Sequence, residues 1–178
     1  PEMFTACVMH SDMRKTGEFH CSNEKVNQLQ SNISWSLRDN FFDIPSDCPQ
    51  RDERLGWMGD AQVFSWTAAF NRETALFFTK WMRDVSAASS LERGVPHIVP
   101  DIQETYSSAA WSDAAVIIPW VVYQTYGDTR ILEESWKCMH EWVDYIHNHV
   151  NENGLWMTNY QYGDWLALDR EMGDKSVG

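Results

Sequence analysis

The chain has 178 residues with 14 basic and 26 acidic side chains, which gives a formal net charge of −12 with histidine neutral. Binding to phosphates needs clustered positive charge, so this balance excludes a nucleic-acid-binding arm and a polybasic membrane surface. Hydrophobic residues make up 43% of the chain and aromatic residues 13%, which is too much for a disordered acidic tail. We therefore expect one globular unit that buries about 70% of its unfolded surface.

Targeting and redox signals are sparse. The longest mostly apolar stretch, Ala114 to Thr125, is shorter than the roughly 20 residues that cross a bilayer. Residues 2–10 lack the basic and apolar regions of a signal peptide, so we expect the native N-terminus to lie elsewhere in a longer protein. The four cysteines show no zinc-binding spacing, and no metal site or cofactor is predicted. Free thiols favour a cytoplasmic over a periplasmic or secreted location.

The elements follow from apolar spacing. Residues 4–10 predict a short strand, and we expect residues 1–21 to connect the chain to a preceding β-domain. Ser22 is the predicted N-cap of the first helix. The spacing predicts helices over residues 22–40, 60–70, 72–88, 107–126 and 128–151. The chain is therefore predicted to be all-α and built from antiparallel helix hairpins.

Two long connectors indicate a single working end. Residues 43–59 and 86–105 lose helical periodicity and contain four of the six prolines. The turns at 71–72 and 127–128 are tight by comparison. Because binding and catalytic residues gather on loops held by a rigid scaffold, we expect function at the end with the long connectors.

Tryptophan is unusually abundant, with ten residues in the chain. Helical spacing places several in the predicted core: Trp66, Trp81, Trp120, Trp136 and Trp142. In the helix over 72–88, the predicted inner face consists of Leu76, Phe77, Trp81 and Val85. Three further tryptophans, Trp57, Trp111 and Trp165, stand beside Asp, Gly or Ser, as in sites where aromatic faces meet the C–H surface of a sugar.

The first connector is strongly acidic. Between Asp39 and Asp60 there are six carboxylates and two arginines. Crowding of like charges raises at least one carboxyl pKa, which lets a carboxylic acid donate a proton near neutral pH. Two carboxyls of different pKa are what acid-catalysed glycoside cleavage needs. Structural ion pairs and a calcium site remain alternatives, although the two arginines oppose a cation.

The run from Asp47 to Gln62, DCPQRDERLGWMGDAQ, resembles the signature of α-L-rhamnosidases of glycoside hydrolase family 78, in which threonine replaces Met58 in many members. Shorter segments resemble the same family in the same order: 17–19, 40–41, 68–71, 95–96, 99–101, 110–115, 118–120, 126–128 and 163–167. The resemblance covers nearly the whole chain.

The resemblance implies a partial (α/α)6 barrel, in which residues 22–178 form the N-terminal half of a six-hairpin toroid. It implies inverting hydrolysis of terminal α-L-rhamnose from rhamnose-containing oligosaccharides or plant glycosides, without a cofactor. Glu53 is implied as the general acid. The implied ligands of the rhamnose hydroxyls are Asp47, Arg51 and Asp60, and the implied pocket lining is Trp57, Trp111 and Trp165. Asp113 and Asp164 are further substrate-binding candidates near the same site.

In the family, the general base is a glutamate later in the barrel, so the 178-residue segment alone is expected to be inactive. Glu104 and Glu171 are not assigned that role. An open half-toroid is also expected to expose apolar helix faces and to associate. Two other interpretations stay open: another six-hairpin glycosidase, and a non-catalytic carbohydrate-binding protein on a decayed barrel.

Overall fold

The computed structural model describes residues 3–158 and 160–163. Its helices are α1 (Glu24–Asn40), α2 (Met58–Asn71), α3 (Ala75–Ala88), α4 (Ala114–Tyr126) and α5 (Arg130–His149). Two short strands, β1 (Phe41–Phe42) and β2 (Ile44–Pro45), pair antiparallel as a hairpin after α1. The all-α prediction is therefore confirmed for the described part of the chain.

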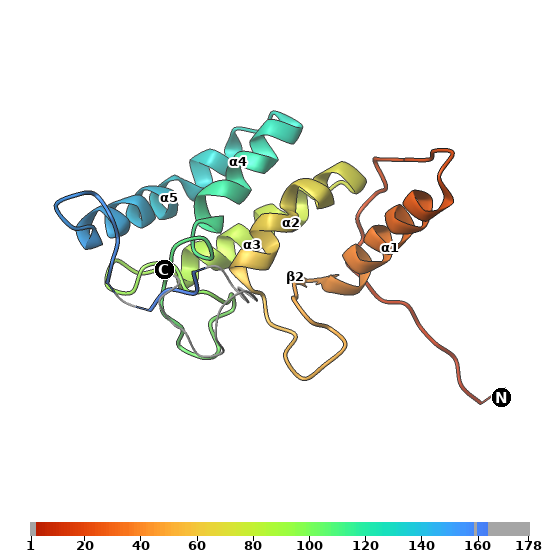
Figure 1. Cartoon of the computed structure of the whole chain (residues 1–178), viewed down its shortest axis with the longest axis horizontal. Coiled ribbons are helices and arrows are strands. Elements are labelled where there is room, and N and C mark those ends of the chain that lie inside the picture. The colour runs from red at the N-terminus through yellow and green to blue at the C-terminus, as the bar shows by residue number, and fades with distance from the viewer. Residues whose placement is uncertain (1–2, 159, 164–178) are drawn as a thin grey trace.

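The helices form hairpins with alternating short and long connections. Three residues join α2 to α3 and three join α4 to α5, whereas residues 46–57 and 89–113 form long loops. Helices α2 to α5 lie side by side, and α1 stands at one edge (Figure 1). The long loops emerge together at one end of these helices, as Figure 1 shows. This is the asymmetry that the sequence predicted.

Several predicted boundaries are wrong. Residues 4–10 form no strand, and residues 3–9 are exposed. Asn23, not Ser22, caps α1, because its Oδ1 accepts the Lys25 N–H at 3.0 Å. The helix predicted from residue 107 begins at Ala114, since the preceding serine-rich residues form turns that bond to one another. Assignment of residues 1–21 and 22–178 to a connector and half a barrel stays a prediction.

The core is formed by the inner faces of α2 to α5 and the end of α1. Trp81 and Trp142 are buried, as are Phe77 and Val85, so these predictions are confirmed. Phe41 stacks on Phe77 with ring centroids 4.7 Å apart, which attaches the hairpin to α3. No helix in the described residues has both the length and the apolarity that crossing a membrane requires.

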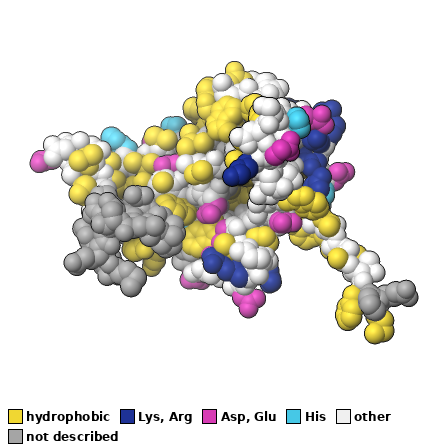
Figure 2. Space-filling model, turned by 45° about the vertical axis from the view of Figure 1, so that its right-hand side comes forward, with side chains coloured by type: hydrophobic (Ala, Val, Ile, Leu, Met, Phe, Trp, Pro, Cys, Tyr) yellow, Lys and Arg dark blue, Asp and Glu magenta, His cyan; other side chains and the backbone are white. Residues whose placement is uncertain are grey.

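Several residues predicted to be buried are exposed. The exposed fractions are 83% for Leu76, 50% for Trp66, 50% for Trp120 and 63% for Trp136, so these core predictions are wrong for this chain. The physical reason is that each helix has more apolar positions than its described neighbours cover. Figure 2 shows hydrophobic side chains at several places on the surface.

The exposed apolar residues of α2 share one face. Val63, Trp66 and Phe70 are all exposed and lie three and four positions apart, which places them along one side of the helix. Trp120 is exposed on the adjacent α4. We call these four residues the apolar stripe. The expectation that the segment exposes apolar helix faces is confirmed.

Candidate active site

The acidic loop, residues 46–57, is closed at its neck by Asp47. The Asp47 N–H donates to the Leu55 carbonyl at 3.0 Å, and the Leu55 N–H donates to Asp47 Oδ1 at 3.2 Å. Between them the chain turns sharply, and Arg54 has a φ of 55°. For a residue other than glycine this left-handed conformation is uncommon, and such conformations concentrate at functional sites.

A second loop, residues 95–101, which we call the supporting loop, is joined to the acidic loop and the start of α2 by backbone hydrogen bonds. The Val99 N–H donates to the Gly56 carbonyl at 2.9 Å, and the Met58 N–H donates to the His97 carbonyl at 2.8 Å. Gly56 is required here because a Cβ would collide with the Val99 carbonyl oxygen. The two loops therefore form one paired layer at the start of α2.

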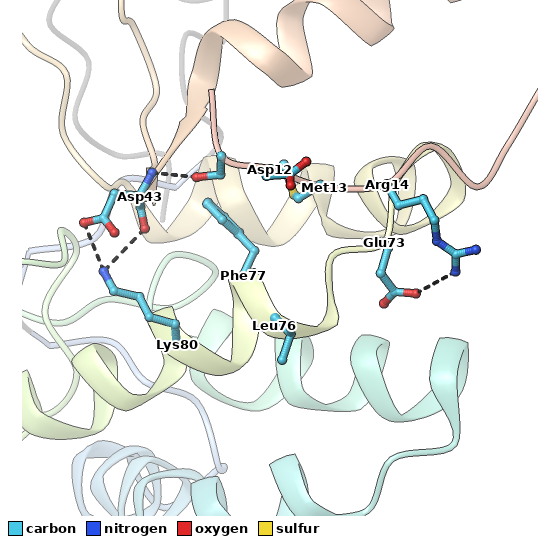
Figure 3. A pocket seen from close by; sticks show the side chains of 9 residues that line it. Asp12, Met13, Arg14, Asp43, Glu73, Leu76, Phe77 and Lys80 are labelled. Carbon is cyan, nitrogen blue, oxygen red and sulfur yellow. Dashed lines mark hydrogen bonds and ion pairs between the residues drawn. The ribbon is translucent and has the colours of Figure 1, made fainter. Parts of the chain in front are cut away.

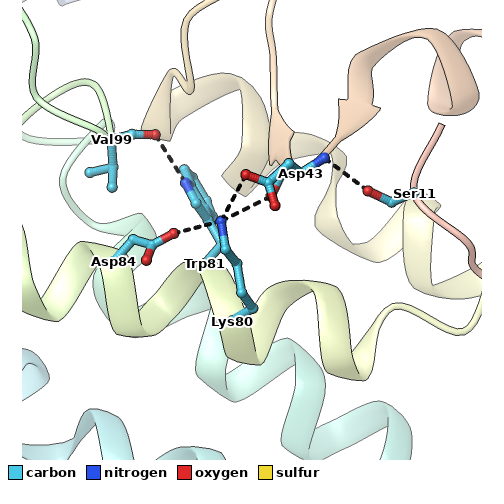
Figure 4. Close-up of polar contacts among 6 residues, drawn as sticks. All are labelled: Ser11, Asp43, Lys80, Trp81, Asp84 and Val99. Atoms are coloured by element: carbon cyan, nitrogen blue, oxygen red, sulfur yellow. Dashed lines mark hydrogen bonds and ion pairs between the residues drawn. The ribbon is translucent and has the colours of Figure 1, made fainter. Parts of the chain in front are cut away.

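The core holds this layer in place. The Trp81 N–H donates to the Val99 carbonyl at 3.1 Å, from α3 to the supporting loop, as Figure 4 shows. The same figure shows Lys80 between Asp43 and Asp84, at 3.2 and 2.9 Å, and Asp43 in turn bonded through its N–H to Ser11. The position of the acidic and supporting loops thus depends on contacts with α3.

Glu53 is held on both carboxylate oxygens. Its Oε2 accepts a hydrogen bond from Arg51 Nε at 2.9 Å and lies 2.6 Å from Arg51 Nη2. Its Oε1 accepts the indole N–H of Trp57 at 3.0 Å. The Glu53 side chain is 26% exposed. The hydrogen bond to Glu53 raises the pKa of Arg51, so the guanidinium stays charged. Three of the predicted site residues thus lie together.

Asp60 is the neighbouring acid, in the first turn of α2. Loss of hydration raises the pKa of its carboxyl, and the carboxylates of Asp47 and Glu53 raise it further. Burial and a hydrogen bond to Asp47 also raise the pKa of the Cys48 thiol. Asp60 is thus a carboxyl of raised pKa in this region, and the main cause is loss of hydration, whereas the sequence argument relied on the crowding of like charges.

One group of possible metal ligands lies in the same loop. Ligand atoms of Asp47, Cys48 and Glu53 lie within 4.8 Å of one another. However, the guanidinium of Arg51 already pairs with Glu53, and Asp47 is bonded to the backbone of Leu55. A hydrogen-bonded set of this kind is typical of an ion-pair network, and we assign no metal to it.

Aromatic rings form a wall beside the carboxylates. The Tyr162 ring centroid lies 6.1 Å from that of Trp57, 4.5 Å from that of Trp111 and 4.8 Å from that of His97. Trp111 packs directly on Gly59, where a Cβ would come within 2.9 Å of the indole. The structure thus brings the predicted Trp57 and Trp111 to one place.

Tyr162 and His97 were not predicted as site residues. The sequence carried a weak signal for Tyr162, which immediately precedes the Gly163-Asp164-Trp165 segment. Nothing in the sequence marked His97, because a lone histidine between apolar residues is typical of a core position.

Asp113 is the residue directly before α4. Its Oδ1 accepts the indole N–H of Trp142 at 2.9 Å, and its Oδ2 accepts the backbone N–H of Ala110 at 2.8 Å. Oδ1 therefore links the turn before α4 to α5, and Oδ2 closes the turn itself. Its predicted role in substrate binding stays a prediction, and the predicted Asp164 and Trp165 lie outside the described residues.

A cavity of about 460 Å³ lies away from the acidic loop. It is bounded by residues 11–14, Asp43 and the first turns of α3, as Figure 3 shows, and none of the predicted site residues line it. Arg14 and Glu73 form a loose ion pair at 3.7 Å on one side of it. The chemistry of the acidic loop is not found there.

Helix hairpins that present acidic and aromatic loops at one end are the architecture of a six-hairpin glycosidase domain. Residues 14–177 match the family described as bacterial alpha-L-rhamnosidase 6 hairpin glycosidase domain. The chain therefore belongs to that family.

Named relatives and solved structures agree with this assignment. An alpha-L-rhamnosidase of Formosa agariphila is 45% identical over 94% of this chain and 18% of its own length, and one of Streptomyces avermitilis is 40% identical over 94% and 16%. The structure of a Streptomyces avermitilis alpha-L-rhamnosidase complexed with L-rhamnose superposes with a TM-score of 0.84 at 39% identity, covering 88% of this chain and 15% of that one. An alpha-L-rhamnosidase structure from Aspergillus terreus gives 0.83 at 43% identity, covering 91% and 19%. The chain spans less than a fifth of the length of these relatives.

Proposed function

We propose that the full-length protein containing this chain is an α-L-rhamnosidase that removes terminal α-L-rhamnose from oligosaccharides or plant glycosides. The observation that carries the proposal is the environment of Glu53, a carboxylate bonded to Arg51 and to the indole of Trp57 beside Asp60. Family membership gives the sugar class, because the relatives are named for it.

Glu53 is the proposed general acid of an inverting reaction. In its protonated form it donates to the leaving glycosidic oxygen, and the resulting carboxylate is stabilised by the Arg51 guanidinium and the Trp57 N–H. Because an inverting site has its two carboxyls about 6.5–9.5 Å apart with a water between them, a second carboxylate is needed. We propose that this base comes from outside the 178 residues.

Asp47, Arg51 and Asp60 are the proposed ligands of the sugar hydroxyls. The raised pKa of Asp60 lets its carboxyl act as a hydrogen-bond donor over a wider pH range than an ordinary aspartate. Trp57 and Trp111 offer apolar faces to the C–H side of the sugar. Asp60 is the second candidate for the acid, because its carboxyl has the raised pKa.

The experiment measures release of L-rhamnose from aryl α-L-rhamnosides by the full-length protein. Glu53→Gln is expected to lower turnover by about 10²–10⁴-fold on a substrate with a poor leaving group, and less on an activated one. Asp52→Asn is the matched control, because this carboxylate lies in the same loop and is fully exposed. It should leave turnover unchanged.

Each other outcome has a defined meaning. If Asp60→Asn shows the dependence on leaving group and Glu53→Gln does not, Asp60 is the acid. Binding of rhamnose without release by the unmodified protein indicates a carbohydrate-binding protein. If the protein releases a different sugar and no rhamnose, it is another six-hairpin glycosidase.

A further inference from the structure

Tyr162 is the centre of an aromatic cluster at the site. Its ring contacts those of Trp57, Trp111, His97 and Tyr160, the last with centroids 5.2 Å apart and planes nearly perpendicular. These residues come from the acidic loop, the supporting loop, the turn before α4 and the segment after α5. Tyr162 therefore joins all the loops that emerge at this end of the helices.

Two of the rings around Tyr162 connect it to the candidate acids. Trp57 donates its indole N–H to Glu53, and Trp111 packs on Gly59, the residue before Asp60. Tyr162 itself is only half-buried, so part of its side chain remains at the surface. Burial raises the pKa of its phenol, which keeps the hydroxyl neutral at ordinary pH.

The His97 ring packs against the ring of Tyr162. Both the N–H and the carbonyl of the His97 backbone are hydrogen-bonded. Its N–H donates to Thr105 Oγ1 at 3.1 Å, and its carbonyl accepts the Met58 N–H at 2.8 Å. The side chain is 3% exposed, with a hydrogen bond to the backbone of Ser107. Its Nε2 is buried and has no hydrogen-bond partner among the residues that the structure describes.

A buried polar atom without a partner destabilises a fold, and an apolar residue of similar size avoids that loss. Stability of the loop is therefore a poor reason for histidine at this position. Residues that violate such local rules concentrate at functional sites. The ring contact with Tyr162 connects His97 to the aromatic wall.

We propose that Tyr162 is a specificity-determining contact for the terminal sugar of the glycoside, and that His97 is the positioning residue that holds its ring against Trp57 and Trp111. The ligand class is a neutral monosaccharide unit with an apolar C–H face, which an aromatic ring recognises by stacking. The inference rests on the proposed function, because it places Tyr162 in the same sugar site.

The test measures KM and kcat on an aryl α-L-rhamnoside with the full-length protein. Tyr162→Ala is expected to raise KM about tenfold with little change in kcat, because the contact is made before and during the reaction. Tyr162→Phe keeps the ring and should stay close to the unmodified protein. Tyr162→Leu removes the flat aromatic face but keeps apolar volume. It should raise KM in the same way, and it replaces Tyr162→Ala if the alanine variant does not fold.

The role of His97 is tested by measuring how substitutions at His97 and Tyr162 combine in their effect on KM. His97→Phe keeps a ring under Tyr162 and should preserve KM, whereas His97→Ala should raise it about fivefold. The same His97→Ala change made on top of Tyr162→Leu should add little, because the positioned ring is already gone. His149→Ala is the matched control, since His149 stacks on Tyr145 at 4.1 Å on α5, away from the site.

Failure of the inference is distinct from failure of the proposed function. An unchanged KM in folded Tyr162→Ala or Tyr162→Leu, in a protein that still releases rhamnose, overturns the role of Tyr162. Independent effects of the two substitutions on KM overturn the role of His97. If the unmodified protein neither releases nor binds rhamnose in calorimetry, the proposed function itself is wrong.

Discussion

The helix tryptophans divide into two sets that the sequence does not distinguish. Trp81 and Trp142 are buried, and their N–H groups donate to the Val99 carbonyl and to Asp113, both in the loops at the site. Trp66 and Trp120 are half exposed on the apolar stripe. The comparison shows that the buried set stabilises the core and also holds the functional loops, whereas the exposed set does neither within the described residues.

The largest expected effect is that of removing a buried ring. Trp142→Ala should lower the free energy of unfolding by about 3–5 kcal/mol, because it leaves a cavity and removes the partner of Asp113. Thermal unfolding of the full-length protein measures this. A loss below 1 kcal/mol would contradict the assignment of Trp142 to the core.

The second prediction concerns pH and His97. Burial lowers the pKa of His97 to about 4, from about 6.5 in an unfolded chain, and Asp101 opposes this shift only partly. Between these values the unfolded state binds more protons than the folded state, so stability falls as pH falls from about 6.5 to about 4. The total effect is on the order of 3 kcal/mol.

The difference in the free energy of unfolding between the unmodified protein and His97→Phe, measured at each pH, separates the contribution of His97 from that of other titrating groups. Denaturant unfolding at a series of pH values should show the phenylalanine variant losing less stability on acidification. Parallel curves for the two proteins would show that His97 does not stay neutral in the fold. His149→Gln is the control, since that histidine is not fully buried.

The apolar stripe should affect association more than stability. Replacing Val63, Trp66 and Phe70 by serine in the 178-residue chain should decrease its self-association by reducing the exposed apolar surface. Sedimentation velocity measures the change. A 178-residue chain that is monomeric before any substitution would contradict the prediction.

The smallest effect is expected from an exposed ion pair between α3 and α5. Arg83 Nε and Nη2 donate to the two carboxylate oxygens of Glu134 at 2.8 and 3.1 Å, but both side chains are largely exposed. Glu134→Gln should therefore change the free energy of unfolding very little, and even less at high salt. A clear loss of stability in chemical denaturation would show that this pair is shielded from solvent in the full-length protein.

The sequence determined the helices, the acidic loop and the family. Apolar spacing located the five helices of the described residues, and the run from Asp47 to Gln62 identified the acidic loop, because local spacing and motif chemistry are properties of neighbouring residues. It could not separate Trp81 from Trp66, since both lie on helical stripes and only the neighbouring helices decide which is buried.

Only the tertiary structure decided which distant residues meet. It brought Tyr162 and His97 to Trp57, paired the acidic loop with residues 97–99 and turned Asp113 toward Trp142. It also located the raised carboxyl pKa on Asp60, which the count of acidic residues could not assign. These features depend on contacts between segments far apart in the chain, where burial and proximity are set by packing and not by local spacing.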